Sequence, residues 1–281
     1  MDKNYVKGIF SIIVSAFGFA CMAFFVKLSG NLPVMQKAIF RNLIAAVIAF
    51  GMLRRSGEPF AIGKGNYTTM ICRCLFGLAG LICNFWVLQY LNMGDASILQ
   101  KMAPFFAVMM SIVVMGEKPG KADLACVAVA LAGAAFVVKP GRGLASFPAL
   151  IGLFGGFCAG TAYTFVRKLG TRGVKGPVIV LCFSASSVLA LLPFVILDYH
   201  PMTMEQTACL LLAGVFASLG QFFVTAAYTY APAKRISVFD YTQVIFAALL
   251  GFVFLREIPD VFSLTGYGII IVTAVIKWKL S

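Results

Sequence analysis

Two polar pairs interrupt apolar stretches of the chain and carry its strongest chemical signals. They are Gln100-Lys101 and Asp240-Tyr241. A charge at the centre of a membrane-spanning helix costs about 2.5–3.5 kcal/mol on insertion scales, so it persists mainly where it has a partner, water or a task. Neither charge is quite central in its segment. Lys101 could extend to the membrane surface and Asp240 could cap a helix N-terminus, and both alternatives compete with a role in solute binding.

Further polar and aromatic side chains recur at helical spacing and mark segment faces that turn away from lipid. The amides of Asn84 and Gln221 are harder to satisfy by packing than Ser or Gly, which let membrane helices approach closely. Aromatic rings could bind a flat or cationic group by stacking or cation-π contact. We therefore expect a substrate site built from Asn84, Trp86, Tyr90, Gln100, Lys101, Tyr163, Gln221, Thr225, Tyr228, Asp240 and Tyr241.

Two arginines also lie inside apolar segments. Arg73 is about one and a half turns from the end of its segment, and we expect it to extend to the membrane surface. Arg41 is deeper and could anchor an anionic group or hold its helix to the carbonyl groups of a neighbour; we favour the structural role. Glu117 and Glu257 flank segment ends, and we expect them to cap helices or tie loops.

The composition requires membrane-spanning helices to position these residues. The chain has 281 residues, of which 61% are hydrophobic and 12% charged, whereas soluble domains have about 45–50% and about 25%. A water-soluble core of this size could not hide so much apolar surface. The chain is therefore predicted to be an all-α integral membrane protein. Its net charge of +13 then marks cytoplasmic loops, and no nucleic-acid partner is expected.

Catalytic and cofactor-binding motifs are absent from the sequence. There is one histidine, and nearly all of the eight cysteines lie in apolar runs, so we expect no metal site and no disulfide. No GxSxG, HExxH or GxxxxGK[ST] motif occurs. We therefore expect neither an enzyme nor a nucleotide-driven pump, and no cofactor. A gradient-driven or exchanging carrier remains, with a small-molecule substrate, the lipid bilayer as surroundings and protons as a candidate coupling ion.

Ten segments are long enough to cross a bilayer, which takes about 20 mostly apolar residues. They run approximately over 8–27, 34–53, 68–91, 96–115, 121–138, 148–168, 176–197, 207–230, 236–255 and 261–277. Of the 23 Lys and Arg, fifteen fall on the side of the N-terminus, five on the other side and three within segments. Because cytoplasmic loops carry the excess of cations, we expect a multi-pass protein of the cell (inner) membrane with both termini in the cytoplasm.

The two halves of the chain align at an offset of 140 residues without a gap. The most informative match is Glu-x-Pro at 117–119 and 257–259, in loops that otherwise differ. We therefore expect two five-helix repeats, 1–140 and 141–281, which an odd helix number places in the membrane with opposite topology. Inverted halves are typical of secondary transporters, with the site between them near the midplane. We expect the repeat to separate Lys101 from Asp240, so that their pairing is weak.

The sequence resembles the EamA-type repeat of the drug/metabolite transporter superfamily. The similarity is carried by Gly116-Glu117 before a small-residue helix with Ala132-Gly133-Ala134, and by Arg256-Glu257 before 266–276. It spans the whole chain, although Phe17-Gly18 stands where Trp is common. The resemblance implies ten helices, with helices 1, 3, 4, 6, 8 and 9 around a central cavity and helices 5 and 10 outside. It fixes the fold and not the substrate, direction or oligomeric state.

The expected function is secondary transport of a small polar metabolite, with an amino acid or related zwitterion as the favoured substrate. A cation and an anion at aligned positions, with amides and aromatic rings nearby, suit a solute that carries both charges. A broad-specificity drug exporter is the alternative if the site proves mainly aromatic. A membrane scaffold without flux is the alternative from another class.

Overall fold

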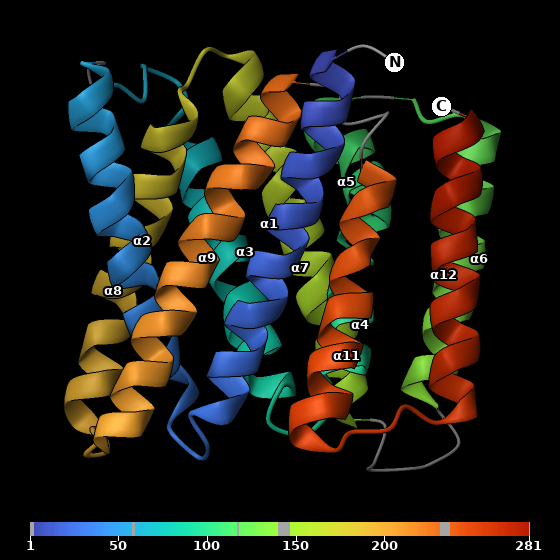
Figure 1. The fold of residues 1–281 in the computed structure, drawn as a ribbon. Coiled ribbons are helices and arrows are strands. Elements are labelled where there is room, and N and C mark those ends of the chain that lie inside the picture. Colours follow the sequence, from blue (N-terminus) through green and yellow to red (C-terminus); the bar gives the residue numbers. More distant parts are fainter. Residues whose placement is uncertain (1–2, 58–59, 117, 140–146, 231–236, 281) are drawn as a thin grey trace.

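The computed structural model is a bundle of helices that run between two edges (Figure 1). It describes residues 3–57, 60–116, 118–139, 147–230 and 237–280. Over these ranges the structure has ten spans long and apolar enough to cross a membrane, and it has no strand. The chain is therefore an all-α, multi-pass membrane protein, which confirms the predicted fold class.

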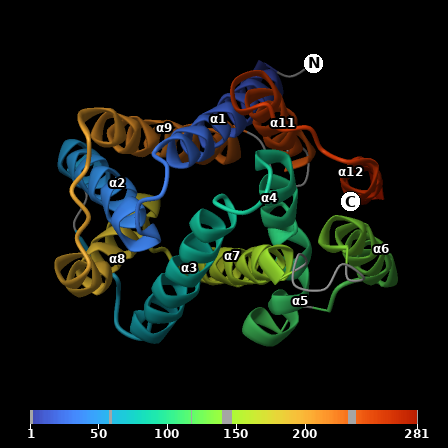
Figure 2. The same ribbon diagram turned by 90° about the horizontal axis from the view of Figure 1, so that it is seen from below.

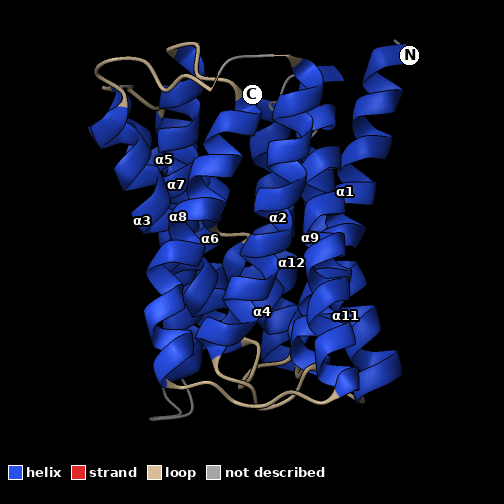
Figure 3. Ribbon diagram, turned by 90° about the vertical axis from the view of Figure 1, so that its left-hand side faces the viewer, coloured by secondary structure: helices blue, strands red, loops and turns tan. Residues whose placement is uncertain are grey.

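Eight of the spans in the described chain are single helices, and the other two are interrupted. The uninterrupted helices are α1 (Lys3–Leu28), α2 (Val34–Ser56), α3 (Tyr67–Val87), α6 (Lys121–Val138), α7 (Phe147–Thr171), α8 (Gly176–Leu197), α9 (Met204–Tyr230) and α12 (Val261–Leu280). The interrupted spans are α4 (Met93–Gln100) with α5 (Ala103–Met115), and the 3-10 helix η2 (Ser237–Tyr241) with α11 (Thr242–Leu255). Figure 3 shows the connecting loops gathered at the two edges.

Helices of the first half pack mainly against helices of the second. α1 packs along α9 and α3 along α7, while α2 meets α8 and α6 meets α12. Seen from below, α6 and α12 lie together at one end of the bundle (Figure 2). Contacts repeat under the 140-residue offset: Ser15 Oγ donates to Gly220 O at 2.7 Å between α1 and α9, and the equivalent Gly155 and Gly80 touch between α7 and α3. The packing is therefore internally symmetric.

The break between α4 and α5 follows from Pro104, which stands at the start of α5. Proline has no backbone N–H, and its ring clashes with the carbonyl group four residues earlier, here that of Gln100. The next amide, Phe105 N–H, donates to Met102 O at 3.0 Å instead of to Lys101 O. The carbonyl group of Lys101 is thereby released from the helix in the interior of a span.

Candidate substrate-binding site

The two interrupted spans meet through an ion pair. Lys101 follows α4 and Asp240 lies in η2, and Lys101 Nζ is 2.5 Å from Asp240 Oδ2. The two side chains are only 11% and 20% exposed. The expectation that the repeat separates these residues is wrong. α4 packs against α11, so the break in one span faces the break in the other.

The ion pair is supported by a hydrogen bond from the second half to the first. Tyr241 Oη donates to Lys101 O at 3.0 Å, so the carbonyl group released by the α4–α5 break is satisfied by the opposite half. Asp240 Oδ1 is buried and has no hydrogen-bond partner among the described residues. Lys101 therefore does not extend to the surface, and Asp240 keeps acceptor capacity inside the bundle.

Glycines bring α7 against the same break. A Cβ atom on Gly156 would lie 2.6 Å from Leu99 O, and one on Gly160 would collide with Ala103 O. Only residues without a side chain allow α7 to approach the α4–α5 junction this closely. The small-residue stripe of this helix therefore serves helix packing, as is common in membranes.

Tyr163 lies on α7, one turn beyond Gly160. Its side chain is 56% exposed, yet its hydroxyl group interacts electrostatically with Asp240, Arg73 and Arg41. These three charges come from η2, α3 and α2, so Tyr163 lies near charged groups from both halves of the chain. Tyr163 thereby links the ion pair to the two partly buried arginines.

The two arginines converge on one aromatic ring. The guanidinium carbons of Arg41 and Arg73 lie 5.8 Å and 4.3 Å from the ring centroid of Phe183 on α8. Arg73 does not extend to the surface as expected, because its guanidinium group lies against Gly77, deeper in the span. Arg41 donates to Asn42 Oδ1 at 2.8 Å, and no bond to a carbonyl group of a neighbouring helix is present in the described structure.

The other predicted site residues are distributed more widely. Asn84 is buried where α3 packs against α7. Gln100 ends α4 beside the ion pair and Gln221 lies on α9, both partly exposed. Thr225 and Tyr228 belong to α9, but their side chains lie outside the described part of the structure. The structure thus brings Lys101, Asp240 and Tyr241 into contact, with Tyr163 nearby, and a binding role for each of the predicted residues stays a prediction.

Trp86 and Tyr90 lie at the end of α3, away from the ion pair. Their ring centroids are 4.3 Å apart, and Trp86 also contacts Phe147, the first residue of α7. Tyr90 is 59% exposed in the turn that follows α3. The rings therefore pack with one another near an edge of the bundle.

Glu257 ties three segments together at the edge where α4 begins. Its Oε2 accepts a hydrogen bond from Met93 N–H at 2.7 Å, and its carboxylate forms an ion pair with Lys27 at the end of α1. This agrees with the expected role of a loop tie. The aligned Glu117 lies outside the described residues.

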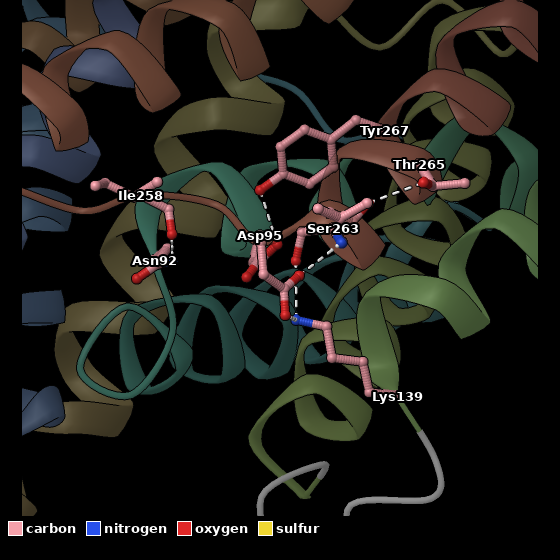
Figure 4. A network of polar contacts seen from close by, with 9 residues as sticks. Asn92, Asp95, Lys139, Ile258, Ser263, Thr265 and Tyr267 are labelled. Atoms are coloured by element: carbon pink, nitrogen blue, oxygen red, sulfur yellow. Dashed lines mark hydrogen bonds and ion pairs between the residues drawn. The ribbon is translucent and has the colours of Figure 1, made fainter.

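A second polar network at this edge was not foreseen (Figure 4). Tyr267 Oη donates to Asp95 Oδ1 at 2.7 Å, while Lys139 Nζ lies 2.7 Å from Asp260 Oδ2 and 3.0 Å from Ser263 Oγ. Donation from Lys139 and from the Ser263 backbone lowers the pKa of Asp260 to about 2. Asp95 is buried, and it was missed because the predicted segment began one residue later. The carboxylate at the first turn of a helix was the available signal.

The described residues contain no cluster of three His, Cys, Asp or Glu side chains that could hold a metal ion. All eight cysteines are free thiols. The carboxylate and the two guanidinium groups act on the Tyr163 phenol, and the amine and the Tyr241 phenol lie at the same ion pair. Such groups bind solutes through charge and hydrogen bonds.

This fold and site define a class of membrane protein, a ten-span helical transporter in which two interrupted spans lie against each other. The chain matches the EamA-like transporter family over residues 6–139 and 146–277, and it belongs to that family. It is a transporter of a small molecule across a membrane, and not an enzyme.

Several known proteins are similar to the chain over nearly its whole length. A pseudopaline exporter of Pseudomonas aeruginosa is 30% identical over 96% of this chain and 95% of that protein. A riboflavin transporter of Vibrio cholerae is 23% identical, covering 96% and 90% of the two chains. Solute carrier family 35 member G1 of Homo sapiens is 22% identical, covering 98% and 80%. One crystal structure, 16% identical, has a TM-score of 0.69 and covers 99% and 98% of the two chains, which shows the shared fold.

Proposed function

We propose that this transporter is a secondary carrier that moves a small polar metabolite, an amino acid or a related zwitterion, by alternating access. The observation that carries the proposal is the ion pair of Lys101 and Asp240, which joins the breaks of two spans from opposite halves. Discontinuous helices that meet near the midplane form the substrate sites of many secondary transporters. Tyr163 and Tyr241 add phenol groups to this site.

A zwitterion suits the polarity of the site. Asp240 Oδ1 has no partner in the described structure, so it can accept a hydrogen bond from an ammonium group. Protons are the coupling ion we propose, because protonation of Asp240 would remove its charge attraction to Lys101 and loosen the contact between the halves. Export is the proposed direction, on the strength of the relative that is named as an exporter.

Alternating access is supported by the symmetry of the packing. Glu257 links Lys27 to the start of α4 at one edge of the bundle. If each half can adopt the packing of the other, this tie opens when the opposite edge closes, and the substrate site changes sides.

The proposed location is the cell (inner) membrane, with both termini and residue 172 in the cytoplasm. Cysteines introduced one at a time, as His200→Cys and Arg172→Cys, test this orientation in a background that lacks the eight native cysteines. An impermeant thiol reagent applied to intact cells should label position 200 and spare position 172. The reverse pattern would show the opposite orientation.

Solute counterflow in liposomes tests the carrier function directly. Vesicles that contain purified protein and a mixture of unlabelled amino acids are diluted into a trace of the labelled forms. A carrier exchanges label for unlabelled solute, so the label should rise transiently above its equilibrium level. Tyr199→Phe, at a loop position that is 57% exposed, is the matched control and should behave as the wild type.

Two outcomes would replace this proposal. Folded protein that exchanges no solute would indicate a membrane scaffold. Exchange of hydrophobic cationic drugs without exchange of amino acids would indicate a broad-specificity drug exporter.

A further inference from the structure

Two guanidinium groups share one site in the interior of the membrane-spanning bundle. Arg41 lies seven residues into α2 and Arg73 six residues into α3, about 10 Å from opposite edges because the two spans are antiparallel. Both side chains turn inward, and both guanidinium groups lie over the ring of Phe183. The two guanidinium groups therefore lie together inside the span of the membrane, where a charged side chain has a high free-energy cost.

Neither arginine has an anionic partner in the part of the chain that the structure describes. Among the described residues, no carboxylate lies within salt-bridge distance of either guanidinium group. Within the described ranges, the Nε atoms of Arg41 and Arg73 are buried without an acceptor, and Asn42 Nδ2 is likewise unpaired. Ser184 Oγ, beside Phe183, also lacks a partner there. The site is rich in hydrogen-bond donors and poor in acceptors, so its missing component is an anion.

Gly77 leaves space for the guanidinium group of Arg73. A Cβ atom on Gly77 would collide with Arg73 Nη1 and would lie 2.9 Å from the Phe183 ring. Gly77 is thus the position that lets the guanidinium group lie between α3 and α8. A side chain there would displace Arg73 without changing the charge of the protein.

The two arginines carry positive charge, whereas Asp240 Oδ1, the unpaired oxygen of the ion pair in the described structure, is a hydrogen-bond acceptor. Lys101 and Asp240 neutralise each other, which leaves the two guanidinium groups as an excess of positive charge. Tyr163 lies within electrostatic range of both arginines and of Asp240, so the donor-rich group and Asp240 Oδ1 both lie near its phenol. This polarity fits a solute with carboxylate at one end and ammonium at the other.

We propose that Arg41 and Arg73 form a subsite that binds a carboxylate group of the transported solute, with Phe183 beneath the two guanidinium groups. Planar guanidinium groups match carboxylates through paired hydrogen bonds. The excess positive charge favours an amino-acid-like solute with more than one carboxylate. This inference rests on the proposed carrier function and specifies its substrate class.

The test compares Arg41→Gln and Arg73→Gln with Arg54→Gln. Arg54 also lies on α2 and also stacks on a phenylalanine, with its guanidinium carbon 5.3 Å from the Phe50 ring, but it is exposed. Thermal unfolding of the purified proteins is measured without solute and with L-glutamate, L-glutamine, succinate, putrescine or inorganic phosphate. A solute that binds only the folded state raises the unfolding temperature.

The proposal predicts that L-glutamate stabilises the wild type more than L-glutamine and putrescine do. Arg41→Gln and Arg73→Gln should weaken L-glutamate binding about 10- to 100-fold, and Arg54→Gln should not. Without solute, Arg41→Gln and Arg73→Gln should unfold at the same or a higher temperature, because a charge inside the bundle has been removed. Gly77→Ala should weaken L-glutamate binding in the same way while all charges remain.

Three outcomes would overturn the subsite. The first is that Arg41→Gln and Arg73→Gln both unfold at a lower temperature than the wild type and still bind L-glutamate. The second is that phosphate alone stabilises the wild type. The third is that no carboxylate in the panel stabilises it. Counterflow separates this inference from the carrier function. Exchange of a solute without carboxylates would support the carrier function and contradict the subsite. Arginine-dependent carboxylate binding without exchange would support the subsite and contradict the carrier function.

Discussion

Lys101 and Asp240 form an ion pair with 2.5 Å between Nζ and Oδ2, although they come from opposite halves of the chain. Beside this pair, Tyr241, which aligns with Lys101 at the 140-residue offset, donates to Lys101 O at 3.0 Å. A residue can approach its own symmetry equivalent only near the axis that relates the two halves. The ion pair therefore lies close to that axis, which is where both halves must rearrange during alternating access.

The ion pair predicts strong coupling between its two residues. Asp240→Asn or Lys101→Gln alone leaves one mostly buried charge unpaired, whereas the double variant leaves two neutral amides. Unfolding free energies of the four proteins in detergent should give a coupling of about 0.5–3 kcal/mol. Additive effects of the two substitutions would show that the contact contributes nothing to stability. All variants that lack either charge should lose counterflow.

Pro104→Ala should repair the interrupted span. The new amide N–H can donate to Gln100 O, so α4 and α5 can join as one helix. We expect an equal or higher unfolding temperature and a large loss of counterflow, because the Lys101 carbonyl group is withdrawn from Tyr241. Pro193→Ala is the matched control, since Pro193 lies inside α8, outside the proposed site. Normal flux in Pro104→Ala would mean that the break has no role in transport.

Glu257→Gln should weaken the tie at the edge where α4 begins. The amide keeps an oxygen for Met93 N–H but loses the charge attraction to Lys27. The equilibrium should shift toward conformations open at that edge, and counterflow should slow because both conformations are needed in every cycle. Glu205→Gln, in the exposed first turn of α9, should transport normally. Equal rates in the two variants would contradict the gating role of Glu257.

Asp260 makes the free energy of unfolding depend on pH in the acid range. Its pKa is lowered to about 2 in the folded protein, against about 3.9 in an unfolded chain. A depressed pKa contributes stability above the unfolded value, and that contribution is lost as the pH falls toward 2. Asp260→Asn should therefore unfold more readily than the wild type at pH 5–8 by a constant margin, and the difference should narrow below about pH 4. A margin that changes between pH 5 and 8 would contradict this assignment.

The ten spans could be predicted from the sequence because the length and polarity of a spanning helix are fixed by the bilayer. The contact between Lys101 and Asp240 could not be predicted in the same way. The repeat shows which positions are equivalent, but only the packing of α4 against α11 shows that these positions lie next to the axis. Pro104 was the sequence signal for the break that makes the contact possible.

The direction of the Arg73 side chain also differs from the prediction, for another reason. Side chains on a helix lean toward its N-terminus, and for α3 that end is the near edge, so extension to the surface was the natural expectation. The absence of a Cβ atom at Gly77, four residues later, allows the guanidinium group to run the other way. Depth along a span is readable from the sequence, whereas the direction of a long side chain depends on the neighbours that leave it room.

Accessibility of position 100 to both sides of the membrane tests the central claim most directly. Gln100→Cys, in a cysteine-free background, places a thiol beside the ion pair at the crossing of the two halves. The account predicts that an impermeant thiol reagent labels this position in right-side-out and in inside-out vesicles, and that Glu257→Gln increases labelling from one side while decreasing it from the other. Labelling from one side only, with no response to Glu257→Gln, would contradict alternating access at this site.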